Sequence, residues 1–146
     1  MMVTELPTDN DKLGIAAEFA GITPPLLFNY WIEPELLQKW WPPEAKTEPR
    51  TGGAYHLFWP QMNWHLRGHY TQLDPGRTLA FTWQWDHYPV IKNVVITFEL
   101  LNDDSTRIML IHSPYGSSEQ DRRDREGHRE GWIHFVSRLQ ELVSNL

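Results

Sequence analysis

Two ionisable side chains lie one turn apart in the longest stretch of helical spacing in this sequence. Asp124 and His128 are spaced i, i+4 within residues 119–143, so we expect both on the sheet-facing side of one helix. His112 ends a predicted strand in phase with the apolar residues before it, and it faces the same space. Carboxylate and imidazole groups brought together in this way are suited to proton transfer, with histidine as acid or base.

Structural roles are the alternative for both histidines. His128 would then be a polar residue at the rim of the helix, hydrogen-bonded to water or backbone, and His112 would donate to a backbone carbonyl. Metal binding by His112, His128 and Asp124 has no support from an H-E-x-x-H or comparable motif, and the chain offers no cysteine ligand. We therefore expect no metal and no cofactor, and we assign no catalytic residue beyond these three candidates.

Aromatic side chains supply the strongest pattern, because the sequence has eight tryptophans in 146 residues. Alternate positions from Leu79 to Trp85 are apolar, which places them on one face of a strand. These rings either pack into a solid core or line a ligand cavity. The residues expected to surround a ligand are Trp40, Trp41, Tyr55, Leu57, Trp59, Trp64, Phe81, Trp83, Trp85, Phe98, Leu110, His112, His128, Trp132 and Phe135. Gly127 and Gly131, also near the sheet-facing side of the helix, suggest close approach of a strand, a partner or a ligand.

Composition excludes several classes of protein. The 19 acidic residues outnumber the 13 basic ones, and acidic residues interleave with the arginines after position 106, so we expect no nucleic-acid partner. No cysteine is present for a disulfide, a thiolate nucleophile or a thiolate metal site. The first residues lack the basic and apolar segments of a signal peptide, and no apolar run is long enough to span a bilayer. A cytoplasmic protein without a membrane partner is the expectation.

The spacing of apolar residues predicts an α+β fold. A first strand is followed by two short helices, which begin at Thr23-Pro24-Pro25 and Glu33-Pro34-Glu35. Trp40 and Trp41 belong to the second helix, which ends at Pro42-Pro43, and they form a lid at the cavity entrance. The predicted strands are residues 12–20, 54–59, 64–73, 78–85, 91–101 and 105–112, an antiparallel meander before the helix over 119–143. We expect one domain over residues 12–146 and a flexible segment over residues 1–11.

Several short motifs together resemble a known family. They are Trp40-Trp41-Pro42, Gly52-Gly53-Ala54-Tyr55, the stretch from Gly68 to Trp83, Thr106-Arg107-Ile108-x-Leu110-x-His112 and Glu130-Gly131-Trp132-x-x-Phe135. In order and spacing they resemble the activator of heat-shock-protein-90 ATPase homologue-like family, of the SRPBCC or START-like superfamily. The resemblance implies a helix-grip fold, as in START and birch-pollen-allergen proteins, with a curved antiparallel sheet around a long C-terminal helix. In many superfamily members the space between sheet and helix binds a hydrophobic ligand, and in a minority it performs chemistry.

These patterns lead to three hypotheses about function and one about the oligomeric state. The leading hypothesis is non-catalytic binding of a small hydrophobic, aromatic molecule between sheet and helix. The alternative is an acid/base enzyme that acts on a hydrophobic carbonyl compound in the same cavity. A further alternative is a chaperone-interaction module, against which stands the family's use of larger proteins with an extra domain for that role. The apolar side chains of Val95, Met109 and Ile111 point away from the helix and predict a homodimer.

Overall fold

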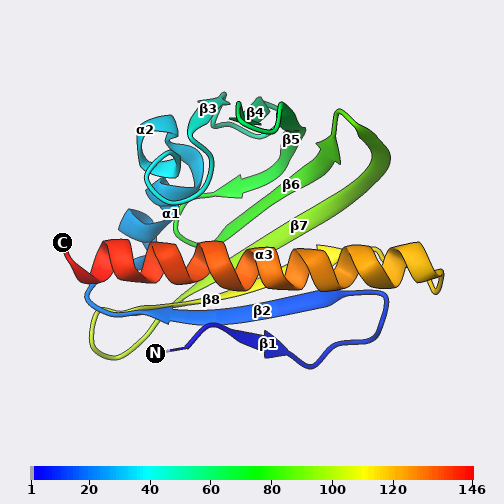
Figure 1. Ribbon diagram of the computed structural model, residues 1–146. Helices are drawn as coiled ribbons and strands as arrows, with labels where there is room; N and C mark the ends of the chain where they lie inside the picture. The colour runs from blue at the N-terminus through cyan, green and yellow to red at the C-terminus, as the bar shows by residue number, and fades with distance from the viewer. Residues whose placement is uncertain (1) are drawn as a thin grey trace.

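An eight-stranded antiparallel sheet curves around a long C-terminal helix in the computed structural model, which describes residues 2–146 (Figure 1). The strands are β1 (Thr4–Leu6), β2 (Leu13–Phe19), β3 (Glu44–Thr47), β4 (Ala54–Trp59), β5 (Trp64–Asp74), β6 (Thr78–Trp85), β7 (Tyr88–Leu100) and β8 (Thr106–Ser113). Their spatial order is β1-β2-β8-β7-β6-β5-β4-β3. The expected helix-grip α+β fold is confirmed.

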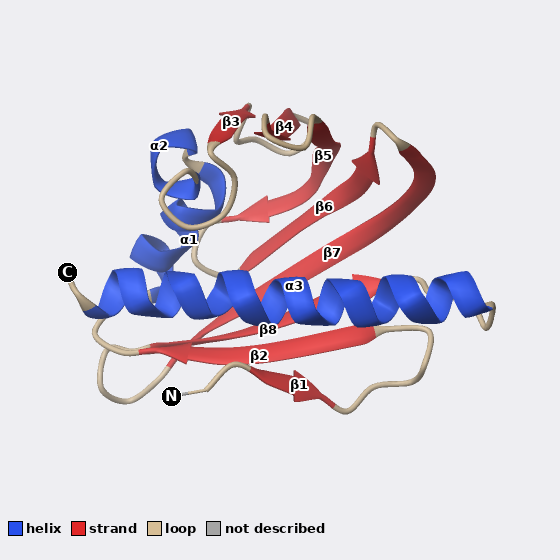
Figure 2. Cartoon of the chain, viewed as in Figure 1, coloured by secondary structure: helices blue, strands red, loops and turns tan. Residues whose placement is uncertain are grey.

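Helix α3 (Glu119–Ser144) lies across the concave face of the sheet, and the short helices α1 (Pro24–Ile32) and α2 (Pro34–Leu37) sit together near its C-terminal end (Figure 2). Ser118 caps α3, because its hydroxyl accepts a hydrogen bond from the backbone N–H of Asp121 at 3.0 Å. The last turns of α3 are packed into the core through Val136, Leu139 and Val143. The earlier turns of the same face are therefore the part free to border a cavity.

The turn between β5 and β6 follows directly from its sequence. In Asp74-Pro75-Gly76-Arg77, the N–H of Arg77 donates to the carbonyl of Asp74 at 3.0 Å. Proline presets the second position of the turn, and Gly76 takes the positive φ of 76° that the third position of a type II turn requires. This tight turn places β6, with its tryptophans, directly beside β5.

Helix α2 is shorter than the sequence predicts. It ends at Leu37, and Trp40 and Trp41 follow it in a turn before Pro42-Pro43. After Leu37 the chain tightens, because the N–H groups of Lys39 and Trp40 bond to carbonyls three residues back, each at 3.2 Å. Trp40 is fully buried, and its indole N–H donates to the carbonyl of Tyr30 at 2.9 Å. Trp40 is therefore a core residue, and the predicted lid is wrong for this side chain.

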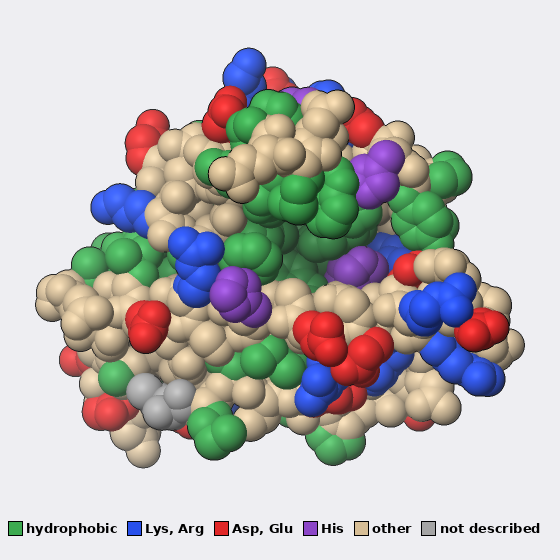
Figure 3. Space-filling view, viewed as in Figure 1, with side chains coloured by type: hydrophobic (Ala, Val, Ile, Leu, Met, Phe, Trp, Pro, Cys, Tyr) green, Lys and Arg blue, Asp and Glu red, His purple; other side chains and the backbone are tan. Residues whose placement is uncertain are grey.

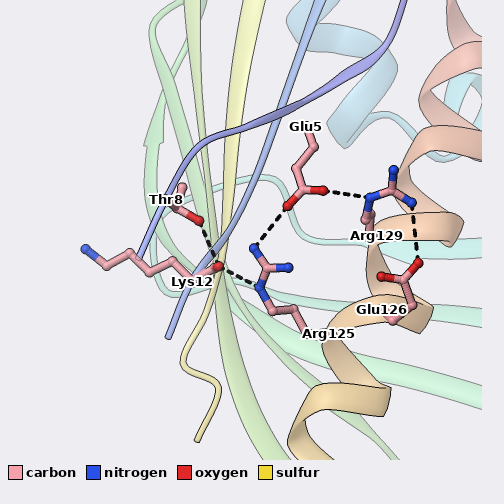
Figure 4. A network of polar contacts seen from close by, with 6 residues as sticks. All are labelled: Glu5, Thr8, Lys12, Arg125, Glu126 and Arg129. Carbon is pink, nitrogen blue, oxygen red and sulfur yellow. Dashed lines mark hydrogen bonds and ion pairs between the residues drawn. The ribbon is translucent and has the colours of Figure 1, made fainter. Parts of the chain in front are cut away.

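The N-terminal segment is more ordered than expected. Within residues 1–11, for which the sequence predicts flexibility, β1 pairs antiparallel with β2. Figure 4 shows why it stays in place: the carboxylate of Glu5 accepts hydrogen bonds from Arg129 at 2.7 Å and Arg125 at 3.1 Å, both on α3. The sequence pattern missed this strand because its three residues are too few to show a period.

Two further differences concern strand boundaries. β3 was not expected, since Glu44–Thr47 is short and carries charges at alternate positions. β7 begins at Tyr88, although Pro89 predicts a break there. The ladder with β6 is irregular between Trp83 and Trp85, which accommodates the missing N–H of Pro89 near the strand end. Within residues 2–146, no helix has the length and apolar character needed to cross a membrane.

Candidate functional site: an aromatic cavity under the C-terminal helix

A cavity of about 510 Å³ lies between α3 and the strands β4 to β7. Figure 3 shows it as a hollow above α3 whose visible lining is mainly hydrophobic, with histidine at its edge. Strand side chains line one wall and helix side chains the other. The lining residues are Trp41, Trp59, Met62, Trp64, Trp83, Trp85, His87, Tyr88, Gln120, Arg123, Asp124, Gly127, His128, Gly131, Trp132 and Phe135.

Six of the eight tryptophans border this cavity and also contact one another. The ring of Trp41 stacks on Trp83 with ring centres 5.9 Å apart, and its centre lies 5.1 Å from that of Trp132. Trp83 meets Trp85 edge-to-face at 5.7 Å. Each ring thus packs against neighbouring rings while part of its surface borders the cavity.

The helix contributes one continuous face to the cavity. Its lining positions recur at spacings of three and one residues, which is the stripe expected for one side of an α-helix. Gly127 and Gly131 belong to this stripe, and a β-carbon built on either would meet no atom within 4 Å. The glycines thus do not mark close approach of another strand; they leave space in the cavity.

His112 and His128 meet at the base of the cavity. Their rings stack 4.4 Å apart with an angle of 12° between the planes. His112 is fully buried and does not line the cavity, and its Nδ1 accepts a hydrogen bond from the indole N–H of Trp132 at 3.0 Å. Burial lowers the pKa of His112 well below its ordinary value, and the nearby His128 and Lys92 lower it further. His112 is therefore a neutral group that joins the sheet to α3.

His128 belongs to a second set of contacts that leads back to the sheet. Its Nδ1 lies 2.7 Å from the hydroxyl of Tyr115. Lys92 is buried, donates to the carbonyl of Pro114, and holds its ammonium group 4.1 Å from the centre of the Tyr115 ring. Burial lowers the pKa of His128 to about 4, with the charge of Lys92 acting in the same direction and that of Asp124 against it. His128 is thus neutral at pH 7.

Asp124 is engaged away from His128. Its carboxylate accepts hydrogen bonds from the hydroxyl of Tyr88 and from the side-chain amide of Gln120, each at 2.8 Å. The bond to Tyr88 ties α3 to the start of β7 across one end of the cavity. Among residues 2–146, no group of three or more histidine, aspartate, glutamate or cysteine side chains is arranged to hold a metal ion.

Residues 22–144 match the family described as Activator of Hsp90 ATPase homolog 1-like protein. The chain belongs to this family. The match covers the two short helices, the strands from β3 to β8 and all of α3, so the cavity lies entirely within the region that defines the family. No curated protein matches the sequence.

Solved structures share the fold of this family member at low sequence identity. A Rhodobacter sphaeroides protein has a TM-score of 0.81 at 17% identity, with 100% of each chain covered. CalU16 from Micromonospora echinospora has a TM-score of 0.72 at 20% identity, covering 97% of this chain and 83% of its own. DynU16, described as a protein in the dynemicin biosynthetic locus, has a TM-score of 0.79 at 15% identity and covers 94% of this chain and 48% of its own. These likenesses concern the fold alone.

The residues expected around a ligand separate into two groups in this family member. Those that line the cavity are Trp41, Trp59, Trp64, Trp83, Trp85, His128, Trp132 and Phe135. Those that do not are Trp40, Tyr55, Leu57, Phe81, Phe98, Leu110 and His112, all of which are buried in the core. The strand pattern correctly indicated which side chains point inward, but inward positions at the α1 end are filled by protein, as Phe28 against Phe98 illustrates.

Five residues that line the cavity were not predicted from the sequence. Gln120 and Arg123 extend the face of Asp124 one turn toward the N-terminus of α3, so the helical stripe contained a signal for them. Tyr88 and His87 follow the β6 strand end, where the sequence pattern indicated only a loop. Met62 lies in the hairpin between β4 and β5, and no pattern indicates that this hairpin reaches the cavity.

Proposed function

We propose that this chain binds a small, planar, aromatic molecule in the cavity between the sheet and α3, without catalysing a reaction. The observation that carries the proposal is the wall of six tryptophan rings around about 510 Å³. Pockets for small molecules typically combine an apolar, aromatic lining with few polar groups. The polar groups here gather at one end, on α3 and the start of β7. The place of DynU16 in a biosynthetic locus is in keeping with a small-molecule ligand.

Acid/base catalysis receives less support from the same geometry. His112 is sealed from the cavity, with its Nδ1 occupied by Trp132. Asp124 is hydrogen-bonded to Tyr88 and Gln120 rather than to His128. The three candidates therefore do not form one relay that faces a substrate. The role of a chaperone-interaction module and the cytoplasmic location stay predictions, and a pull-down with heat-shock protein 90 tests the former.

Filling the cavity tests the proposal directly. Gly131→Leu places a branched side chain into the lining without removing any existing contact, because a β-carbon there meets no atom within 4 Å. We expect calorimetric titration with fluorene, a flat tricyclic hydrocarbon, to show binding to the wild type. In the variant, overpacking of the site should weaken binding about tenfold or more.

Glu130→Leu is the matched control, since residue 130 is exposed on the same helix and lies outside the cavity lining. It adds the same apolar side chain, and the affinity for fluorene should stay at the wild-type value. A wild-type protein that binds neither fluorene nor related polycyclic probes would contradict the proposed function.

A further inference from the structure

The two ring nitrogens of His128 have different surroundings. Burial raises the pKa of Tyr115, so its hydroxyl keeps its proton. Nδ1 of His128, 2.7 Å away, is the one hydrogen-bond partner of this hydroxyl in the described part of the chain, so the hydroxyl is assigned as the donor. A neutral imidazole with an accepting Nδ1 carries its proton on Nε2. Because His128 lines the cavity, this Nε2–H is the group left for a molecule bound there.

A second donor lies beside it without a partner. Trp83 is 6% exposed and lines the cavity, and its indole N–H is buried without a hydrogen-bond partner in the described part of the chain. The ring centres of Trp83 and His128 are 5.6 Å apart. This nitrogen is closed off from the cavity as well as unpartnered, so a bound molecule does not reach it, and the Nε2–H of His128 is the donor that this part of the wall offers.

The charged groups of the lining are already engaged. Asp124 accepts from Tyr88 and Gln120. Arg123, which also lines the cavity, pairs with Glu119 at 3.1 Å and donates to the side-chain oxygen of Gln120 at 3.1 Å. A carboxylate on the ligand would have to lose its hydration among tryptophan rings and near Asp124, which is costly without a free cation. A neutral acceptor avoids this cost.

We propose that the cavity selects planar aromatic ligands that carry a neutral carbonyl oxygen, with His128 Nε2–H as the donor that recognises it. The inference rests on the proposed function and names the chemical class of its ligand. His128 is the specificity-determining residue in contact with the ligand. Tyr115 is a positioning residue, because it fixes which nitrogen of His128 carries the proton, and Lys92 packs against its ring.

A pair of probes with matched shape isolates the carbonyl. Fluorene and 9-fluorenone are both flat tricyclic molecules, and they differ at one position, where fluorene has a CH₂ group and fluorenone has a C=O group. From the net free energy of one hydrogen bond, we expect wild-type protein to bind fluorenone about three- to tenfold more tightly than fluorene in calorimetric titrations. Fluorene-9-carboxylate, with an anionic acceptor, is expected to bind more weakly than fluorenone.

Variants identify the donor. His128→Phe keeps a ring of similar size but removes the N–H, so the preference for fluorenone should fall to about onefold while fluorene still binds. His134→Phe is the control, because residue 134 is exposed on the same helix and lies outside the lining. Equal binding of the two neutral probes to wild type, or a preference that survives in His128→Phe, overturns the assignment. Wild-type protein that binds none of the probes overturns the proposed function as well.

The role of Tyr115 is measured without any ligand. Nitrogen-15 NMR of wild-type protein should show His128 protonated at Nε2, and Tyr115→Phe should yield a mixture of the two neutral tautomers. The preference for fluorenone should shrink in parallel in this variant. Protonation of His128 at Nδ1 in the wild type would overturn the proposal, whatever the probes do.

Discussion

At the scale of single residues, the stacked pair of His112 and His128 makes protonation costly. Both rings are neutral in the folded protein because burial lowers the pKa of each, and each neighbours the other and Lys92. In the unfolded chain, histidine takes up a proton near pH 6.5. Between that pH and about 4, the unfolded state therefore binds more protons than the folded state, which links folding to pH.

We predict that the free energy of unfolding is highest above pH 6.5 and falls as the pH is lowered toward 4.5. Each histidine held neutral contributes a slope of up to about 1.4 kcal/mol per pH unit. Urea denaturation at a series of pH values measures it. His128→Phe should reduce this slope by the contribution of one histidine. A flat profile over this range would contradict the neutral pair.

At the scale of elements, α3 combines two tasks along one face. Its C-terminal half fills the core, whereas its N-terminal half leaves space beside the tryptophan wall. Glycine in a helix interior costs up to about 1 kcal/mol relative to alanine. Gly127 and Gly131 therefore weaken the helix at the positions where a side chain would narrow the cavity.

Replacing both glycines by alanine should separate stability from binding. Neither new methyl group meets an atom within 4 Å, so we predict a gain of up to about 2 kcal/mol in the free energy of unfolding from helix propensity alone. The same methyl groups enter the cavity and should weaken fluorenone binding. Chemical denaturation and calorimetry measure the two effects. Gly68→Ala is the contrasting control: its β-carbon would overlap the carbonyl oxygen of Thr82, so it should destabilise the protein.

Most elements could be predicted from the sequence, because burial on one face imposes period two on strands and the helical stripe on α3. The meeting of His112 and His128 also followed, from the phase of His112 in its strand together with the fold that the family resemblance implies. What could not be predicted is which inward-facing rings meet a cavity. The side chains of Phe81 and Trp83 lie on the same face of β6, but only Trp83 lines the cavity. That difference depends on how α1 and α2 fill one end of the space between the sheet and α3. Such packing between distant segments leaves no local pattern in the sequence.

At the scale of the whole molecule, the outer face of the sheet carries exposed apolar side chains. Val95 is 38% exposed and Met109 is 40% exposed, and Val95 pairs with Ile111 in the ladder between β7 and β8. The predicted homodimer would cover this face. It stays a prediction of the sequence pattern.

Light scattering over a range of protein concentrations tests the dimer, and we expect twice the monomer mass at high concentration. Met109→Lys places a charge in the proposed contact and should restore the monomer. Leu26→Lys, at a residue that is 58% exposed on α1, is the matched control and should not. A monomer at every concentration would rule out this use of the face.

Most of the chain must be synthesised before strand β2 can pair with its main partner, β8. It pairs with β8 along its whole length, from Leu13 opposite His112 to Phe19 opposite Thr106, and only the three-residue β1 covers its other edge. Contacts between segments so distant in sequence form slowly, and an unpaired apolar strand is prone to associate with other chains. As the nascent chain leaves the ribosome, Leu13, Ile15 and Phe19 therefore stay unprotected until the C-terminal quarter emerges. Circular permutants that join β2 directly to β8 would shorten this exposure.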